Sequence, residues 1–346
     1  MDQNLNKLIS IQSETNSDDL FKNNRKWISN FLKDDKNLGF VNFKKKLEES
    51  NIIIRNHSNI KSQSNPEIEI HFAKTYKKKF NCIQYLLLPE AKEIIKKNDL
   101  NKLKFAYDKI FCQYDDYIDN EKIFKLYYPY DLNISDKLVP FNDRKFACII
   151  TSNKNLKFDT KNNLYPFRYK LIKWYERNRQ NKLESFGIDW HLPMKKTGYL
   201  GRVLNFINKS GFYKLYYKSP KNYMGLVKSK KETLSNFKFA FCFENCSING
   251  YLSDIIFDSM NTLTVPIYLG PKNINDYLPE SCFINFRNFK NFEELDRYLN
   301  NIDKKKYEEI INNIFSFYKS VNSEVFKMNS FINILVSSIK KDLNLI

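Results

Sequence analysis

The stretch that most constrains the fold is a nearly continuous apolar run, Phe237–Phe243, that ends abruptly in Glu244 and Asn245. A run of this kind is typical of a parallel strand buried on both faces. An apolar-periodic helix follows around residues 255–260, and then comes a second apolar run, Thr264–Leu269, which stops at a Gly-Pro turn signal. The stretch therefore predicts one β-α-β unit of a doubly wound α/β sheet.

Polar side chains are concentrated where the first of these strands ends. In open α/β sheets the ligand site lies outside the carboxyl ends of the strands. The residues expected there are Glu244, Asn245, Tyr251, Ser253 and Asp254. A buried carboxylate is costly unless it is hydrogen-bonded. Glu244 therefore either caps amides of the next loop or orients the hydroxyl groups of a ligand, and the sequence leaves both roles open.

The same theme recurs along the chain. Tyr85–Leu88 is an apolar run closed by Pro89 and Glu90, and Phe146–Ile150 is a β-branched run followed by polar residues. With 346 residues, two domains are expected, 1–145 and 146–346, with C-terminal helices that could pack back on the first. Residues 1–20 show no strong pattern and predict an arm. Residues 187–190 predict a short strand, and Gly198 and Gly201 bracket a predicted turn.

Charge and composition narrow the classes of function. The net charge of +18 favours anionic partners: nucleotides, nucleic acid or an acidic membrane surface. The lysines are spread along the whole chain and the apolar runs end in acidic residues, whereas nucleic-acid modules concentrate their charge in a stripe. The six cysteines show no metal-ligand spacing, which predicts free thiols and no metal site. No window approaches the roughly 20 apolar residues of a membrane span, and residues 1–16 are polar, so a cytoplasmic protein is expected.

The segment FKFAFCFEN…GYLSDIIFDSMNTLTVPIYLGP resembles the signature of the α1,3/4-fucosyltransferase family, glycosyltransferase family ten. The family pattern is YKF-x-x-x-FEN, then YVTEK, then a T-(V/I)-P-(V/I)-x-x-G strand. The resemblance extends through DYLPESCFINFRNFKNFEELDRYL, FACIITSN and RYKLIKWYE. It covers residues 145–318 well and 85–131 loosely. It implies a GT-B-type fold with two Rossmann-like domains facing a central cleft, and the soluble bacterial kind of enzyme.

The resemblance also implies roles for residues. The reaction would be inverting transfer of L-fucose from GDP-fucose to a saccharide acceptor, without a required cofactor or metal. Glu90 would be the general base on the acceptor side, with Glu93 as its substitute. The donor would be bound by Arg168 at its diphosphate and by Glu244, Asn245, Tyr251, Ser253 and Asp254. Expected partners are GDP-fucose, an oligosaccharide or glycolipid acceptor in surface glycan or lipopolysaccharide synthesis, and an anionic membrane surface, but no nucleic acid.

One departure separates this chain from the family pattern. Asp254 and Ile255 stand where the family has Glu-Lys, so the lysine expected at the diphosphate is absent. Either another cation (Arg202, Lys272 or Lys238) fills the space, or the chain is catalytically weakened or uses another nucleotide sugar. A basic nucleic-acid-binding protein is the alternative outside enzymes.

Overall fold

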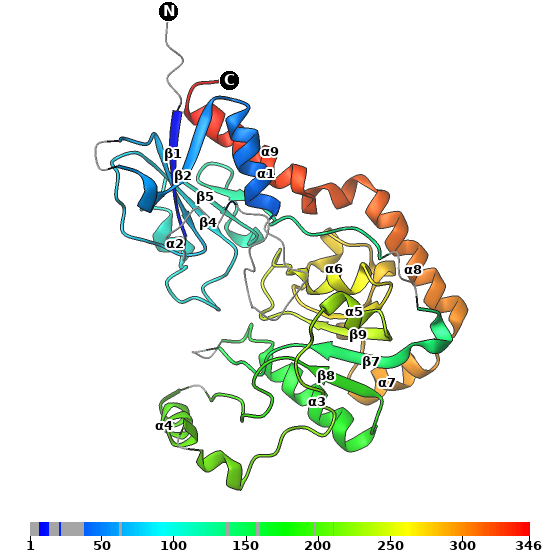
Figure 1. The fold of residues 1–346 in the computed structure, drawn as a ribbon. Helices are drawn as coiled ribbons and strands as arrows, with labels where there is room; N and C mark the ends of the chain where they lie inside the picture. The colour runs from blue at the N-terminus through cyan, green and yellow to red at the C-terminus, as the bar shows by residue number, and fades with distance from the viewer. Residues whose placement is uncertain are drawn as a thin grey trace, which may run out of the picture. The chain divides into compact units, whose positions relative to one another are not determined.

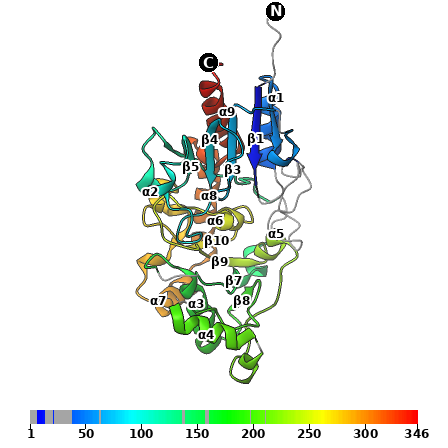
Figure 2. The ribbon, with the colours of Figure 1, turned by 90° about the vertical axis from the view of Figure 1, so that its left-hand side faces the viewer.

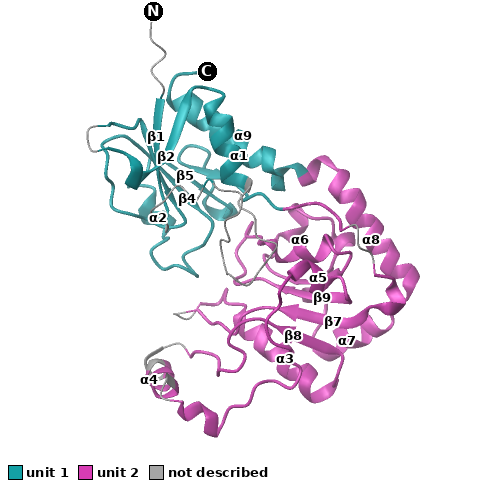
Figure 3. Cartoon of the chain, in the orientation of Figure 1, with its two compact units in different colours: residues 1–30, 35–130, 324–346 teal, residues 31–34, 131–323 magenta. Residues whose placement is uncertain are grey.

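The computed structural model describes residues 7–13, 21, 38–61, 64–135, 139–156, 160–196, 198–209 and 211–346. The chain forms two compact units (Figure 3). Unit 1 comprises residues 1–30, 35–130 and 324–346, and unit 2 comprises residues 31–34 and 131–323. The sequence placed the boundary near residue 145. In the structure, the change of unit falls between Tyr130 and Asp131, and the C-terminal segment belongs to unit 1.

Unit 1 is built on a parallel sheet of six strands in the order β2-β1-β3-β4-β5-β6 (Figure 2). Its strands are β1 (Lys7–Gln12), β2 (Ile52–Asn56), β3 (Ile68–Phe72), β4 (Ile83–Leu88), β5 (Lys109–Cys112) and β6 (Ile123–Lys125). Its helices are α1 (Leu38–Glu48), α2 (Leu100–Leu103) and α9 (Met328–Asp342).

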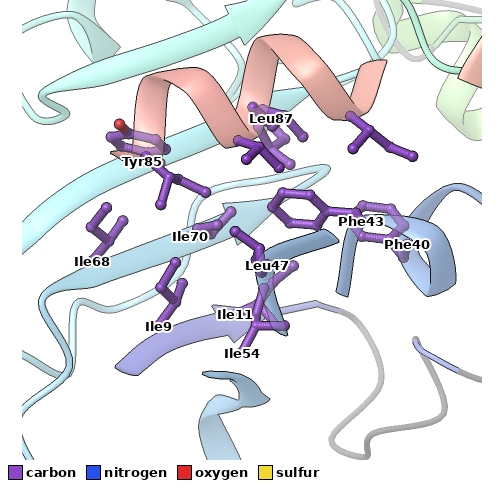
Figure 4. Packing of buried hydrophobic residues seen from close by; sticks show 14 of the residues in the cluster. Ile9, Ile11, Phe40, Phe43, Leu47, Ile54, Ile68, Ile70, Tyr85 and Leu87 are labelled. Carbon is purple, nitrogen blue, oxygen red and sulfur yellow. The ribbon is translucent and has the colours of Figure 1, made fainter. Parts of the chain in front are cut away.

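The core of unit 1 joins residues from the two ends of the chain. Phe40 and Phe43 of α1 pack edge-to-face on Phe331 of α9, with ring centroids 5.9 and 6.4 Å apart. Figure 4 shows the α1 side chains together with those of the strands, including Ile70 and Leu87. Asp342 near the end of α9 also accepts a hydrogen bond of 2.5 Å from the hydroxyl of Tyr85. The last helix is therefore part of this core.

Strand β1 corrects the expectation of an unstructured arm at residues 1–20. Residues 7–12 lie between β2 and β3, and Ile9 and Ile11 are fully buried. The apolar stretch is short and lies among polar residues, and Ser10 within it is buried too. Pairing with β2 and β3, a tertiary effect, therefore makes residues 7–12 a strand, although their local sequence pattern is weak.

Unit 2 is built on a parallel sheet of five strands in the order β11-β10-β9-β7-β8 (Figure 1). Its strands are β7 (Lys145–Ile150), β8 (Leu183–Phe186), β9 (Phe237–Phe243), β10 (Val265–Leu269) and β11 (Ile284–Asn285). Its helices are α3 (Tyr165–Asn178), α4 (Gly198–Lys209), α5 (Lys230–Leu234), α6 (Asp254–Met260), α7 (Phe292–Asn300) and α8 (Lys304–Lys319). The predicted β-α-β unit is thus present as β9, α6 and β10.

Two predictions between β8 and β9 are wrong. The strand expected at residues 187–190 lies earlier, at Leu183–Phe186. The strand ends just before Gly187, whose φ of 128° is a conformation that favours glycine. A Cβ at this position would also lie 2.0 Å from the Thr151 carbonyl oxygen, so no other residue fits. Gly198 and Gly201, expected to bracket a turn, lie instead in the first turn of helix α4.

Candidate functional site

The candidate site lies where β9 ends, and local capping signals position its side chains. Helix α3 begins at Tyr165, whose amide donates to the Asn163 side chain at 3.1 Å. Ser253 is the N-cap of α6, and its hydroxyl accepts from the Ile255 amide. The loop before α3 pairs with the loop after β9, since the Leu164 amide donates to the Asn245 carbonyl at 3.2 Å. These contacts bring α3 and the start of α6 to the carboxyl end of β9.

Arg168 joins α3 to the end of β9. Its Nε and Nη2 donate to the Phe243 carbonyl, the Nε contact at 2.9 Å, and Nη2 also donates to the Asn245 side chain at 3.1 Å. The residue is 6% exposed, and burial lowers the pKa of its guanidinium, against the favourable charges of Tyr165 and Glu244. Its Nη1 makes no hydrogen bond within the part of the chain that the structure describes, which leaves two N–H donors for an anionic ligand.

Glu244 is fully buried and accepts three hydrogen bonds. The amide and hydroxyl of Ser253 donate at 2.9 and 2.7 Å, and the Tyr268 hydroxyl donates at 3.1 Å. Burial raises the pKa of Glu244 to about 7, although the Ser253 bonds and the charge of Arg168 lower it. These contacts give Glu244 the first of the two roles that the sequence left open, holding the loop that leads into α6.

Asn245 connects Arg168 to Tyr251. Its amide nitrogen donates to the Tyr251 hydroxyl at 3.3 Å while its oxygen accepts from Arg168. Tyr251 is 3% exposed. The structure thus brings five of the predicted residues into two bonded chains: Arg168–Asn245–Tyr251 and Glu244–Ser253.

Asp254 is held by a lysine that the sequence did not predict. Lys230, at the start of α5, donates to Asp254 at 2.7 Å and to Asp258 at 2.9 Å. Burial by itself would lower the pKa of Lys230, but the two carboxylates outweigh it and raise the pKa well above its ordinary value. Since one ammonium faces two carboxylates, the triad carries a net negative charge. It therefore does not supply the positive charge that Ile255 lacks.

Arg287, after β11, is a second cation that the sequence analysis missed. Its Nη2 donates to the Ser247 hydroxyl at 2.8 Å and to the Gly270 carbonyl at 2.7 Å, beside the carboxyl ends of β9 and β10. The segment FINFRNF contributed to the family resemblance only as similar sequence. The bond from Arg287 to Ser247 spans 40 residues, so the sequence alone does not reveal it. The signal available in the sequence was the position of Arg287 inside a segment that resembles the family.

The other cations named from the sequence lie in different places. Lys272 is exposed in the loop after β10. Lys238 lies near the beginning of β9, the opposite end of the strand, with its ammonium 3.9 Å from the centre of the Phe141 ring, so it is not available for the site. Arg202 belongs to α4, but its side chain lies outside the described residues.

Gly270 is required by close packing rather than by backbone conformation. The sequence predicts a turn requirement, but the φ of Gly270 is not positive. A Cβ at this position would lie 2.3 Å from the Tyr268 hydroxyl oxygen. That hydroxyl donates to Glu244, so any side chain at 270 would displace a donor to the buried carboxylate.

The predicted catalytic base lies in unit 1. Glu90 follows β4, is half-buried, and its carbonyl accepts from the Asn98 side chain at 2.7 Å. The Tyr114 hydroxyl donates to the Pro89 carbonyl at 2.7 Å, which fixes the segment just before Glu90. Glu93 lies one turn further along the chain. Both carboxylates therefore occur at the carboxyl end of the unit 1 sheet, the end at which such sheets bind ligands.

Three further findings concern bound groups and context. Among the described residues, no group of three His, Cys, Asp or Glu side chains could hold a metal ion. The six cysteines are free, and five of them are buried. No helix in the described ranges has the length and apolar character needed to cross a membrane.

Sequence comparison finds a family model that matches residues 208–333. They match the model "Glycosyltransferase family 10 (fucosyltransferase) C-term". The α-(1,3)-fucosyltransferase FucT of Helicobacter pylori is 34% identical over 140 residues, 33% of this chain and 29% of the relative. The mouse 4-galactosyl-N-acetylglucosaminide 3-α-L-fucosyltransferase 9 is 34% identical over 74 residues, 21% of each chain. The matched stretches thus span less than a third of these curated relatives.

Structural comparison covers almost the whole chain. An α1,3-fucosyltransferase solved with GDP aligns with a TM-score of 0.52 and 17% identity, over 93% of this chain and 92% of its own. Anabaena HepE, solved with UDP and glucose, aligns with a TM-score of 0.53 and 9% identity, over 97% and 100%. At these identities the likeness concerns the fold alone. The chain has the GT-B-type fold, with two parallel-sheet α/β units.

Proposed function

We propose that this chain, whose residues 208–333 match the model of the C-terminal domain of glycosyltransferase family 10, transfers L-fucose from GDP-fucose to a saccharide acceptor with inversion. The fucosyltransferase relatives in sequence and the GT-B fold support glycosyl transfer. The donor is proposed by extension from the structural relative that was solved with GDP. An acceptor in surface glycan or lipopolysaccharide synthesis, and a cytoplasmic location, belong to the same proposal.

The observation that carries the proposal is the arrangement of Arg168. Its guanidinium is fixed at the end of β9 by the Phe243 carbonyl and the Asn245 side chain, bonds that use Nε and Nη2 and not Nη1. A guanidinium held in this way meets a phosphate without losing side-chain entropy on binding. Arg287, held on the Gly270 carbonyl, adds a second cation near the same strand ends.

These cations suit a reaction in which a diphosphate leaves. As the bond between the sugar and GDP breaks, negative charge grows on the diphosphate, and fixed cations stabilise that charge most where water is scarce. We propose that Arg168 and Arg287 perform this task without a required metal or cofactor. Asp254, although bound to Lys230, keeps oxygen lone pairs that could accept from a ribose hydroxyl, since a carboxylate has about four acceptor sites.

The acceptor side of the reaction is assigned to Glu90. The carboxylate would remove a proton from the acceptor hydroxyl, whose oxygen then attacks the anomeric carbon opposite the departing GDP. One bond forms to the acceptor oxygen, one breaks to the diphosphate, and the proton stays on Glu90. A positioned base typically contributes about 10²–10⁴-fold to the rate.

A second nucleotide sugar is the competing candidate within the fold. Ile255 replaces the lysine of the family motif, and Lys230 is neutralised by two carboxylates, so the diphosphate meets fewer cations than the motif predicts. This arrangement would also suit a catalytically weakened relative.

Titration calorimetry with GDP, UDP, CMP and a short oligonucleotide tests the assignment. GDP is expected to bind most tightly, and at 100 times its dissociation constant it should stabilise the folded state by about 2.7 kcal/mol. Release of GDP from GDP-fucose in the presence of oligosaccharide acceptors then tests transfer. Preferential binding of UDP would indicate another nucleotide-sugar donor. Preferential binding of the oligonucleotide would contradict the glycosyltransferase assignment.

A further inference from the structure

Helix α4 exposes an apolar stripe to solvent. The exposed fractions are 45% for Val203, 48% for Leu204, 75% for Phe206 and 39% for Ile207. At about 100° per residue, these four positions fall within a sector of about 160° around the helix axis. An amphipathic helix of a globular protein ordinarily turns such a stripe toward the core.

The opposite side of α4 is the one that faces the protein. Asn205 lies opposite the centre of the stripe, and its side chain pairs with the backbone of Lys196, accepting from the amide at 3.0 Å and donating to the carbonyl at 2.8 Å. Gly201 is buried on the same side, where a Cβ would be 2.7 Å from the Lys196 carbonyl carbon. The small and polar residues therefore pack inward, and the apolar ones remain exposed.

The exposed apolar surface continues beyond the helix. In the following 3-10 turn and just after it, Phe212 is 56% exposed, Leu215 78% and Tyr216 60%. The helix packs on this turn, and in Figure 1 both lie away from the strands of unit 2. We call the seven side chains the α4 surface: Val203, Leu204, Phe206, Ile207, Phe212, Leu215 and Tyr216.

The sequence around the α4 surface carries charge of one sign. Residues 191–231 contain ten lysines and arginines and no aspartate or glutamate, and one of the ten, Lys230, is paired with the carboxylates of Asp254 and Asp258. Lys195, Lys196, Lys214 and Lys218 are exposed. Elsewhere acidic residues are common, 39 in the whole chain, so a stretch of 41 residues without one marks a local departure. An apolar stripe flanked only by cations is complementary to an anionic lipid surface.

We propose that the α4 surface docks in the headgroup region of an anionic bilayer, with its aromatic and aliphatic side chains inserted and the lysines on lipid phosphates. A protein partner is less complementary than an anionic bilayer, because it would need a broad apolar patch surrounded by acidic side chains that pair with the lysines. A nucleic acid would leave the apolar stripe without a partner. This inference stands on the surface alone and does not depend on the proposed reaction.

Co-sedimentation with vesicles tests the proposal on the full chain. Vesicles of phosphatidylcholine alone are compared with vesicles containing phosphatidylglycerol, at low and high salt. The protein is expected to bind the anionic vesicles more tightly by roughly fivefold per engaged cation, and to lose that advantage in high salt.

Matched variants distinguish vesicle binding by the α4 surface from nonspecific binding by other exposed apolar side chains. Phe206→Ser with Leu215→Ser should reduce partitioning by at least about tenfold. The control, Phe105→Ser with Val321→Ser, removes side chains that are 81% and 79% exposed elsewhere and should leave binding unchanged. Lys214→Gln with Lys218→Gln should reduce binding to anionic vesicles only. Melting temperatures of all variants should match the wild type, since every changed side chain is exposed.

Four results would overturn the proposal. They are equal binding to neutral and anionic vesicles, equal losses in the α4 and control variants, a dimer in sedimentation velocity that the Phe206→Ser variant abolishes, and oligonucleotide binding without vesicle binding. The third would make the surface an interface between copies of this chain, and the fourth would assign the lysines to nucleic acid.

Discussion

Glu244 illustrates how a single residue couples folding to the site. Its carboxyl is fully buried, its pKa is raised to about 7 from an ordinary 4.5, and its oxygens hold the Ser253 loop and Tyr268. Because the folded state binds a proton more readily than the unfolded state, this raised pKa adds stability at low pH. The contribution is complete below about pH 4.5 and is lost as the pH rises through about 7.

We therefore expect Glu244→Gln to alter the pH dependence of stability. Between pH 5 and 8 the wild type should lose up to about 3 kcal/mol relative to the variant, because each unit of pKa shift is worth about 1.36 kcal/mol. Urea denaturation at a series of pH values measures the difference. The exposed Glu293→Gln variant is the control and should follow the wild type. Parallel profiles for wild type and Glu244→Gln would contradict the raised pKa.

Arg168→Lys should weaken GDP more than GMP. The lysine keeps the positive charge but lacks the planar guanidinium, which can donate to the Phe243 carbonyl and to a ligand at the same time. A charge-assisted hydrogen bond is worth about 1.5–3 kcal/mol, roughly ten- to a hundred-fold in affinity. Calorimetry with both nucleotides gives the ratio.

A matched control for this variant is Arg144→Lys. Arg144 is buried as deeply and donates to the Phe237 and Leu263 carbonyls, beside the beginnings of β9 and β10. It should lower the melting temperature without changing the ratio of GDP to GMP affinity. Equal losses of GDP and GMP in Arg168→Lys would mean that Arg168 supports the fold only.

At the scale of elements, α5 and α6 are joined by the triad of Lys230, Asp254 and Asp258. Ile255 lies in the first turn of α6 and is half-buried, and its carbonyl accepts from the Cys242 thiol at 3.3 Å. A long side chain at 255 therefore has a route to solvent at the helix start. Asp254 is the neighbouring residue and shares the Lys230 ammonium with Asp258, so an added lysine has acidic groups close by.

Ile255→Lys is accordingly expected to fold and to tighten GDP, and a gain in the rate of transfer should accompany it. Calorimetry and GDP release measure the two effects, and Ile255→Met, similar in length but uncharged, is the control. A loss of several kcal/mol in stability with no change in GDP affinity would place residue 255 in the core, where an unpaired ammonium is very costly. That result would also remove the ligand role proposed for its neighbour Asp254.

The elements also show how far sequence reasoning reaches. β9, α6 and β10 could be predicted because each carries a long apolar run or a clear period. β1 could not, since only its pairing with β2 and β3 makes a short stretch among polar residues a strand. α4 was missed because two glycines indicated a turn, and its inverted apolar face depends on contacts with Lys196. Lys230 and Arg287 reach partners 17 to 40 residues away, a pairing that no local pattern reveals.

At the scale of the whole molecule, the proposed chemistry draws on both units. Glu90→Gln should lower the rate of transfer by about 10²–10⁴-fold, because the amide cannot accept the acceptor proton. GDP affinity should remain nearly unchanged, since the donor residues belong to unit 2. Turnover with saturating donor, together with calorimetry, measures both. Near-normal turnover in Glu90→Gln together with an inactive Glu93→Gln would identify Glu93 as the base. Activity in both variants would mean that neither residue is the base.

The discontinuity of unit 1 sets an order for folding during synthesis. Its first strand, β1, leaves the ribosome early, but the sheet lacks the cover that Phe331 and its neighbours in α9 supply until more than 300 residues have been made. Unit 2 is almost one continuous stretch and can close its own core first. Domains generally fold from the N-terminus during translation. In this chain, however, we expect unit 2 to complete its core before unit 1, whose sheet keeps an uncovered apolar face until α9 has been made.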